Sequence, residues 1–158
     1  MRKQNLQGTT VPAVGEGKRG EQGYTGYLLG QAYAAHRIRM EKALVDKGIT
    51  LPQFSVLTML AAYPGASGAD LARLALLTPQ TMSVIVSNLE RDGMVTRQPH
   101  PVHGRIQLID ITAEGRALLA QCKHLVQPIG QSLTAGLGAE EEKIVRRWLV
   151  EIAQGGVV

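Results

Sequence analysis

The chain has 158 residues, a net charge of +4 and a single cysteine. This length is typical of one domain, and one cysteine excludes an internal disulfide framework and is typical of a reducing cytoplasm. No run approaches the roughly 18 consecutive apolar residues of a membrane-spanning helix, and no apolar segment follows the basic N-terminal residues as in a signal peptide. We therefore expect a small soluble protein of the cytoplasm with no membrane segment.

The N-terminal residues 1–23 are predicted to form a flexible arm. They include five glycines and show no apolar periodicity, so they bury too little surface to offset the entropy of ordering. This arm has four basic and two acidic residues, as does the segment 24–62, whereas 63–112 has four of each and 113–158 five of each. A DNA-binding function therefore has to be argued from the pattern of the middle segment and not from its bulk charge.

Capping residues and glycines divide the remaining chain into six helices and two strands. The residues that mark helix starts are Thr50, Ser67, Thr78 and Thr112, and those that mark helix ends are Gly48 and Gly93. Runs rich in Val, Ile and Thr predict the strands. The expected elements are helices over 24–47, 50–62, 67–75 and 79–92, strands over 94–98 and 106–111, and two helices within 113–154.

The helix over 79–92 has two unlike faces. Its apolar stripe, at the spacing of one helical face, is Met82, Ile85, Val86 and Leu89. The opposite face is Gln80, Ser83, Val84, Ser87 and Arg91. Short polar side chains on that face leave the helix backbone free to approach another molecule closely. Val84 is the apolar exception at its centre.

A short helix, a tight turn, a capped helix with a polar face and a hairpin follow one another over about 50–112. This order is typical of a winged helix-turn-helix, so we predict a mainly α fold with a small β-hairpin wing. The helix 79–92 would enter the major groove, and the wing 97–106 would reach along the DNA backbone toward the minor groove. The candidate DNA-contacting residues are Arg73, Thr78, Pro79, Gln80, Thr81, Ser83, Val84, Ser87, Asn88, Arg97, His100, His103, Gly104 and Arg105.

Several short motifs lie in this segment. They are Leu71-Ala72, Leu74-Ala75, Thr78, the run Leu89-Glu90-Arg91-Asp92-Gly93-Met94-Val95, Arg97, Arg105 and the run Ile111-Thr112-Ala113-Glu114-Gly115. Together they resemble the MarR family of bacterial transcription regulators over about residues 71–116. The resemblance implies one domain over 24–158, pseudo-palindromic double-stranded DNA as partner, and no cofactor. It also implies a repressor that a small aromatic effector releases.

The resemblance implies in addition a homodimer, built by helices over about 24–47 and 113–154. The last helix has no later chain to cover its apolar side, so that side fits a monomer core or a dimer contact equally well. The resemblance favours the dimer. The apolar residues expected at this contact are Leu28, Leu29, Leu125, Ile129, Leu133, Trp148, Leu149 and Ile152.

Two positions depart from the family pattern. His103 stands where the wing usually has an acidic residue, and Val84 stands where relatives often place an arginine. Because arginine bonded to guanine is the commonest specific base contact, we expect Val84 to contact a thymine methyl group instead.

Two residue types admit a second interpretation. His100 and His103 are too few for a metal site, so we expect no metal and expect both to strengthen contacts with phosphates as the pH falls. Cys122 lies on an apolar stripe, which favours packing over the alternative of a redox-sensing regulator.

The resemblance implies an effector site near the first two helices, where the candidate residues with polar tips are Tyr33, His36 and Tyr63. The alternative is that each of them is an ordinary packed residue. The interior proline Pro128 predicts a kink in the fifth helix, which would help to shape a cavity.

The sequence has no Gly-rich phosphate loop and no nucleophile beside a base, so we do not expect an enzyme. The alternative function is a winged-helix protein-interaction module without DNA binding, which the neutral segment 63–112 would suit.

Overall fold

The computed structural model describes residue 13 and residues 20–155. Its helices are α1 (Thr25–Leu44), α2 (Leu51–Ala62), α3 (Gly68–Leu74), α4 (Pro79–Arg91), α5 (Ala113–Ser132) and α6 (Ala139–Ala153), with short 3-10 turns η1 (Gly20–Gln22) and η2 (Val45–Lys47). The strands are β1 (Ala66–Ser67), β2 (Val95–Pro99) and β3 (Gln107–Ile111). The predicted mainly α fold with a small wing is confirmed. Most of the expected flexible arm lies outside the described residues, and its last part contains η1 instead of irregular chain.

Helices begin at the predicted caps because the capping side chains satisfy amide groups that have no partner within the helix. Thr50 Oγ1 accepts from Gln53 N at 3.3 Å, and Gln53 Oε1 accepts from Thr50 N at 3.0 Å, which is the reciprocal capping box. Thr78 Oγ1 accepts from Thr81 N at 3.2 Å in the same way at the start of α4. The predicted first helix differs in one respect, because its last turn tightens into η2.

The sheet has three strands, where the sequence predicted a two-stranded hairpin. The order is β1-β3-β2, all antiparallel, with Ala66 opposite Ile109 and Val95 opposite Ile111. A strand of two residues shows no alternation of its own, so its pairing is decided by its tertiary neighbour. Asp110 supports this pairing, since its Oδ1 accepts from Gly65 N at 2.8 Å just before β1.

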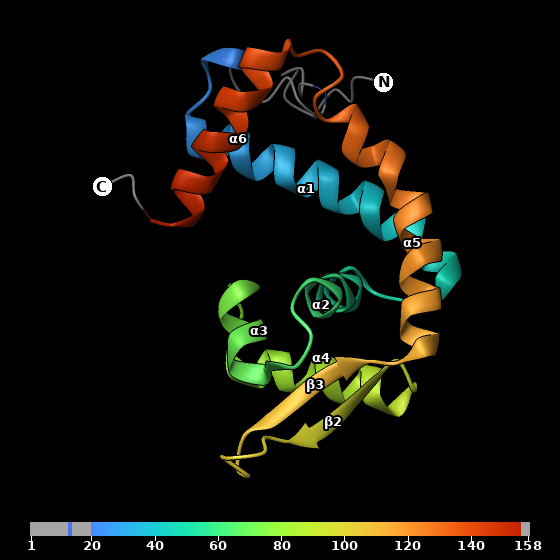
Figure 1. Cartoon of the computed structure of the whole chain (residues 1–158). Helices are drawn as coiled ribbons and strands as arrows, with labels where there is room; N and C mark the ends of the chain where they lie inside the picture. The colour runs from blue at the N-terminus through green and yellow to red at the C-terminus, as the bar shows by residue number, and fades with distance from the viewer. Residues whose placement is uncertain (1–12, 14–19, 156–158) are drawn as a thin grey trace, which may run out of the picture.

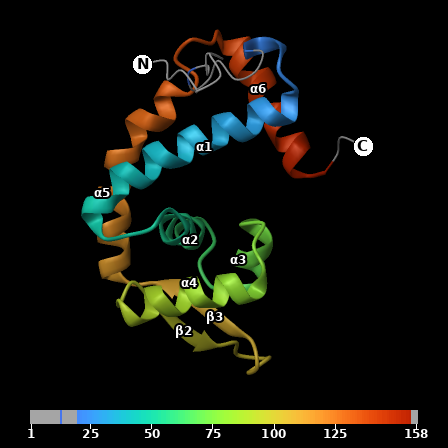
Figure 2. The same cartoon turned by 180° about the vertical axis from the view of Figure 1, so that it is seen from behind.

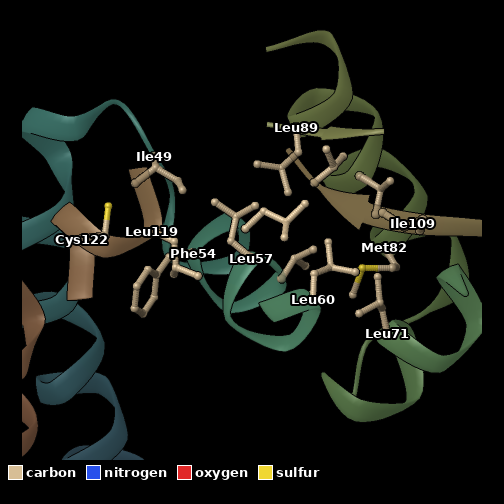
Figure 3. Packing of buried hydrophobic residues seen from close by; sticks show 14 of the residues in the cluster. Ile49, Phe54, Leu57, Leu60, Leu71, Met82, Leu89, Ile109, Leu119 and Cys122 are labelled. Carbon is tan, nitrogen blue, oxygen red and sulfur yellow. The ribbon is translucent and has the colours of Figure 1, made fainter. Parts of the chain in front are cut away.

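The core of the winged helix-turn-helix is centred on α2. Leu57 and Leu60 of α2 are fully buried and pack in one cluster with Leu71 of α3, Met82 of α4 and Ile109 of β3 (Figure 3). The cluster continues through Ile49 and Phe54 to Leu119 and Cys122 on α5. One continuous core therefore joins α2, α3, α4 and β3 to the first half of α5 and fixes their orientation relative to that helix.

Beyond that core the molecule opens into a second group of helices. Figures 1 and 2 show α1, α6 and the distal half of α5 together at one end, and the strands and α4 at the other. The helix α5 changes direction along its length in Figure 1, and Pro128 lies inside it. Within the described residues, no helix is long and apolar enough to cross a membrane.

Candidate nucleic-acid interface

The helix α4 presents a polar face to solvent. Met82, Val86 and Leu89 point into the core and are at most 2% exposed. The outward positions on the predicted polar face are exposed, and Val84 at their centre is 62% exposed. The exposed residues among the candidates on α4 and its cap are Thr78, Pro79, Gln80, Thr81, Ser83, Val84 and Ser87, whereas Asn88 is half-buried.

The N-terminus of α4 is held by its own side chains. Thr78 Oγ1 lies 2.9 Å from Thr81 Oγ1 in addition to its bond with the Thr81 backbone N–H. The structure therefore gives Thr78 a capping role in the free protein, and its hydroxyl is already occupied. The centre of the outward face is formed by Gln80, Ser83 and Val84. Within the described part of the chain, none of these three side chains forms a hydrogen bond like that of Thr78.

Arg97 joins the wing to α4. Its Nη2 donates to Ser87 Oγ at 2.9 Å, and its Nε lies 3.2 Å from Glu90 Oε2. The Arg97 side chain is 30% exposed, so it lies between β2 and α4 instead of projecting toward solvent. The sequence predicted that Arg97 contacts DNA. The structure engages it with α4, where Glu90, a residue that the sequence analysis did not single out, offsets its charge.

Arg73 belongs to a small network at the start of α3. Ser67 Oγ donates to Asp70 Oδ2 at 2.7 Å, and Arg73 Nη2 donates to Asp70 Oδ1 at 3.0 Å. The hydrogen bond from Ser67, followed by that from Arg73, lowers the pKa of Asp70 from its ordinary value. The Arg73 side chain is 75% exposed, and an exposed pair of this kind contributes little to stability. Its guanidinium is therefore free to exchange the carboxylate for another anion.

The tip of the wing is an ordered turn between β2 and β3. Nδ1 of His100 accepts from the backbone N–H groups of Val102 and His103, each at 3.1 Å, and the two histidine ring centroids are 5.4 Å apart. Gly104 and Arg105 are exposed, and Arg105 forms no ion pair or hydrogen bond within the part of the chain that the structure describes. Arg105 is thus the exposed cation of the wing with no anionic partner there.

A groove of about 380 Å³ lies between these elements. Pro79, Met82 and Ser83 of α4 form one side, and Arg97, Ile106 and Gln107 of the hairpin form the other. The groove therefore separates the exposed face of α4 from the hairpin, and Arg97 is the cation that lines it.

A larger cavity of about 610 Å³ lies where α1, α2 and α5 meet. Its lining residues are His36, Met40, Phe54, Thr58, Lys123, Val126, Gln127, Gly130 and Leu133. Of the three predicted effector residues only His36 is among them, and its Nδ1 is buried with no hydrogen-bond partner among the described residues. Tyr33 and Tyr63 are 61% and 57% exposed and line none of the described cavities. The other lining residues, such as Met40, Phe54 and Lys123, were not predicted. They belong to three separate helices, so no local sequence pattern indicates that they line one cavity.

Five of the eight residues expected at a dimer contact line a second apolar cavity of about 740 Å³, between α1, α5 and α6. Leu28, Leu29, Leu133, Trp148 and Leu149 line it. Leu125 is 38% exposed elsewhere on α5, and Ile129 and Ile152 are half-buried and do not line this cavity. No residue of α6 is buried in the described chain, although the helix has a clear apolar side.

Cys122 is fully buried in the core beside Leu119 (Figure 3). Burial raises the pKa of its thiol, and the positive charge of Lys47 opposes that effect only in part. Among the described residues there is no group of three or more His, Cys, Asp or Glu that would hold a metal ion. His100 and His103 therefore have no third metal-ligating side chain beside them among the described residues.

The comparisons with known proteins agree with this geometry. The sequence profile of the MarR family matches residues 47–106. An HTH-type transcriptional repressor of Mycobacterium tuberculosis is 37% identical over 127 residues, which cover 80% of this chain and 91% of the repressor. CouR from Rhodococcus jostii RHA1, bound to p-coumaroyl-CoA, aligns with a TM-score of 0.76 at 29% identity over 81% of this chain and 90% of CouR. A mutant of MarR from Escherichia coli, in complex with operator DNA, aligns with a TM-score of 0.73 at 26% identity over 80% of this chain and 91% of that chain.

Proposed function

This chain belongs to the MarR family of transcription regulators, and we propose that it is a cytoplasmic, homodimeric repressor that binds pseudo-palindromic operator DNA and is released by a small aromatic effector. Its relatives are regulators and not enzymes. The observation that carries the proposal is the outward face of α4, which is exposed and free of charge at its centre, together with the exposed cations Arg73 of α3 and Arg105 of the wing.

In this proposal the two kinds of DNA contact come from different residues. Gln80, Ser83 and Val84 read base edges in the major groove, because they form the exposed centre of α4. Arg73 and Arg105 contact phosphates, which fixes the register without reading sequence. Arg97 acts indirectly, since its hydrogen bond with Ser87 and its ion pair with Glu90 hold the wing at a set position relative to α4.

The proposed homodimer follows from α6. An amphipathic helix with no buried residue leaves its apolar side against water, and a second copy that covers the cavity lined by Leu29 and Trp148 removes this exposure. A two-fold dimer places two α4 helices in successive major grooves. The operator would then mirror the protein's symmetry, which is the reason to expect a pseudo-palindrome.

The proposed effector site is the cavity at α1, α2 and α5. It joins apolar walls, such as Met40 and Phe54, to a few polar groups. The buried Nδ1 of His36 has no hydrogen-bond partner among the described residues, so it is suited to a hydroxyl or carboxylic acid group of a ligand. The cavity touches α2 of the winged helix-turn-helix and α1 and α5 of the dimerisation group. A ligand that prefers one spacing of these helices would shift the distance between the two α4 helices.

DNA binding is tested by fluorescence anisotropy with the intergenic DNA beside the protein's own gene, over a series of salt concentrations. We expect binding tighter than to a scrambled duplex, with an affinity that falls with salt at a slope of several units. Arg105→Ala should weaken binding and reduce the slope by about one unit per arginine removed. The matched control is Arg37→Ala on α1, which removes the same charge from a pair with Glu41.

Failure of the wild type to bind at low salt would contradict the proposal. It would favour the alternative of a winged-helix protein-interaction module, which the equal numbers of acidic and basic residues in 63–112 would suit.

The dimer is tested by sedimentation velocity. Leu149→Lys places a charge on the apolar side of α6 and should shift the protein from dimer to monomer. Glu151→Lys introduces the same side chain on the other side of the helix, at a residue that pairs with Arg147, and should leave the dimer intact. Equal sedimentation of both variants would contradict the assignment of this face.

The effector site is tested with a panel of hydroxylated benzoates and cinnamates in a thermal-shift assay. A member of the panel should raise the melting temperature of the wild type and weaken its DNA binding. His36→Ala should abolish both effects, whereas Tyr33→Ala should not, because Tyr33 lies outside the cavity. Release that persists in His36→Ala would place the effector elsewhere.

A further inference from the structure

The turn at the wing tip, residues 100–106, is organised by one side chain. It lies at the end of the hairpin farthest from α6 (Figure 1). The backbone N–H of His100 donates to Ile106 O at 2.8 Å, and Ile106 N donates to His103 O at 2.8 Å. Inside the turn, Nδ1 of His100 accepts the two backbone N–H groups of Val102 and His103. Asn and Asp side chains commonly bond the backbone two residues ahead in this manner, and here an imidazole does so.

This arrangement requires a neutral imidazole. Nδ1 accepts a hydrogen bond only when the ring proton is on Nε2, because both nitrogens of an imidazolium are donors. A protonated His100 would therefore point an N–H group at two other N–H groups and would lose both bonds. Histidine is the side chain whose charge ordinarily changes between about pH 5 and 8.

The surroundings of His100 do not compensate for an added positive charge. The titratable and charged groups of the turn are His103, whose ring faces that of His100, and Arg105. Lower in the hairpin, Arg97 is paired with Glu90. No aspartate or glutamate occurs in the sequence between Asp92 and Asp110, and Asp110 bonds the Gly65 backbone. Protonation of His100 would thus add a positive charge beside His103 and Arg105, in a turn that has no carboxylate.

We propose that His100 is a positioning residue that holds the wing tip in its DNA-binding shape while it is neutral and releases the tip when it is protonated. Binding to DNA then weakens when His100 becomes protonated, because the two hydrogen bonds to its Nδ1 are lost. Arg105 lies in the same turn, so a loosened tip no longer presents its guanidinium at a fixed position. This inference rests on the proposed DNA-binding function. The pH dependence of DNA affinity in this proposal is opposite to the one predicted from the sequence, where both histidines strengthen contacts with phosphates as the pH falls.

Three variants separate these effects. His100→Asn keeps an acceptor, since Asn Oδ1 is attached to Cγ as His Nδ1 is, but it does not titrate. His100→Ala removes the acceptor at every pH. His103→Ala is the matched control, because it removes the other histidine of the turn and leaves Nδ1 of His100 with its two backbone donors.

The first measurement uses the free protein, with the amide signals of residues 102 and 103 followed by NMR between pH 8 and 5. Their temperature coefficients report whether each N–H is hydrogen-bonded. We expect the wild type to lose both bonds as the pH falls, His100→Asn to keep them and His100→Ala to lack them throughout. In His103→Ala the signal of residue 102 should follow the wild type. Bonds that persist in the wild type at pH 5 would overturn the proposal.

The second measurement is operator affinity by fluorescence anisotropy at constant salt. At pH 7.5 His100→Asn should match the wild type, and His100→Ala should bind about three- to tenfold more weakly. At pH 5.5 the wild type should approach His100→Ala, while His100→Asn retains its relative affinity. Identical pH profiles for wild type and His100→Asn would overturn the proposal. If none of the proteins binds DNA at pH 7.5, the proposed function fails, and the amide signals still decide the role of His100.

Discussion

Gly115 in the first turn of α5 lies directly against the carbonyl group of Met94, at the start of the wing. A Cβ built on Gly115 would collide with that carbonyl oxygen and would lie 2.9 Å from Cγ1 of Ile111. The same carbonyl accepts from Thr112 N at 3.0 Å, and Thr112 Oγ1 donates to Gly93 O at 2.7 Å. The wing and the long helix α5 thus meet at a junction where a Cβ at Gly115 has no space.

Gly115→Ala should therefore destabilise the fold. Backbone must move to accommodate the methyl group, and we expect a loss of about 1–3 kcal/mol in the free energy of unfolding. Gly130→Ala on the same helix is the control, because a Cβ there meets nothing within 4 Å. It should be neutral or stabilise by about 0.5–1 kcal/mol, since alanine restricts the unfolded chain. Urea unfolding of both variants checks this, and equal stabilities would contradict the close contact.

Leu76 occupies a backbone position that normally suits glycine. It closes α3 with φ 53°, and the bonds Leu76 N to Arg73 O and Leu77 N to Ala72 O form a Schellman motif. Gly93 closes α4 in the same way with φ 75°. Because Leu76 is 78% exposed, Leu76→Gly loses little packing and relieves a left-handed conformation that costs roughly 1–2 kcal/mol.

We expect Leu76→Gly to raise the free energy of unfolding by about 0.5–1 kcal/mol, after the greater entropy of glycine in the unfolded chain is subtracted. Gly93→Ala, the reverse substitution at the equivalent position, should lower it. Thermal unfolding of the two variants measures both effects. A Leu76→Gly variant less stable than the wild type would mean that the leucine side chain makes a contact that offsets its strain.

The Ser67, Asp70 and Arg73 network predicts a loss of stability in acid. The pKa of Asp70 is lowered by its bonds with Ser67 and Arg73, so its contribution is present above the pKa of about 3.9 that an unfolded chain shows and is lost as the pH falls through the folded value. The stability difference between wild type and Asp70→Asn should shrink between pH 6 and pH 3. The control Asp46→Asn removes an exposed carboxylate with no ion pair in the described part of the chain. A difference that does not change with pH would contradict the network.

Cys122 should be unreactive in the native protein. Its full burial and the raised pKa of its thiol leave little thiolate and no access for a reagent. We expect slow reaction with Ellman's reagent at pH 7.5 and complete reaction in urea, together with unchanged DNA affinity after mild peroxide treatment. Rapid native reaction, or DNA release by peroxide, would support the redox-sensing alternative.

Val84 should determine one base of the operator. We expect Val84→Arg to change the preferred base pair, because arginine bonds guanine whereas valine packs on a thymine methyl group. Val102→Arg at the wing tip is the control, since Val102 is also exposed and gains the same charge. Selection from random duplexes should return a changed site for Val84→Arg and an unchanged site for Val102→Arg. If all three proteins select one site, Val84 does not read a base.

The elements that could be predicted from the sequence are those whose signals are local. Thr50 and Thr78 cap helices through bonds to amides three residues ahead, and the stripe through Met82 and Leu89 marks the buried face of α4. Such bonds and spacings lie within one or two helical turns, so they can be read along the chain. The two wing strands were predicted for the same reason. Where a predicted strand end differs from the observed one, the difference is one residue.

By itself the sequence thus determined the mainly α winged helix-turn-helix, the helix with an outward polar face and the resemblance to a regulator family. The tertiary structure decided the partners of those residues. Arg97 contacts Ser87 and Glu90 of α4, and the two residues of β1 pair with β3. His36, Phe54 and Lys123 line one cavity, which Tyr33 and Tyr63 do not line. These contacts join residues on separate elements, and their formation depends on how helices pack around one core, which no local pattern encodes.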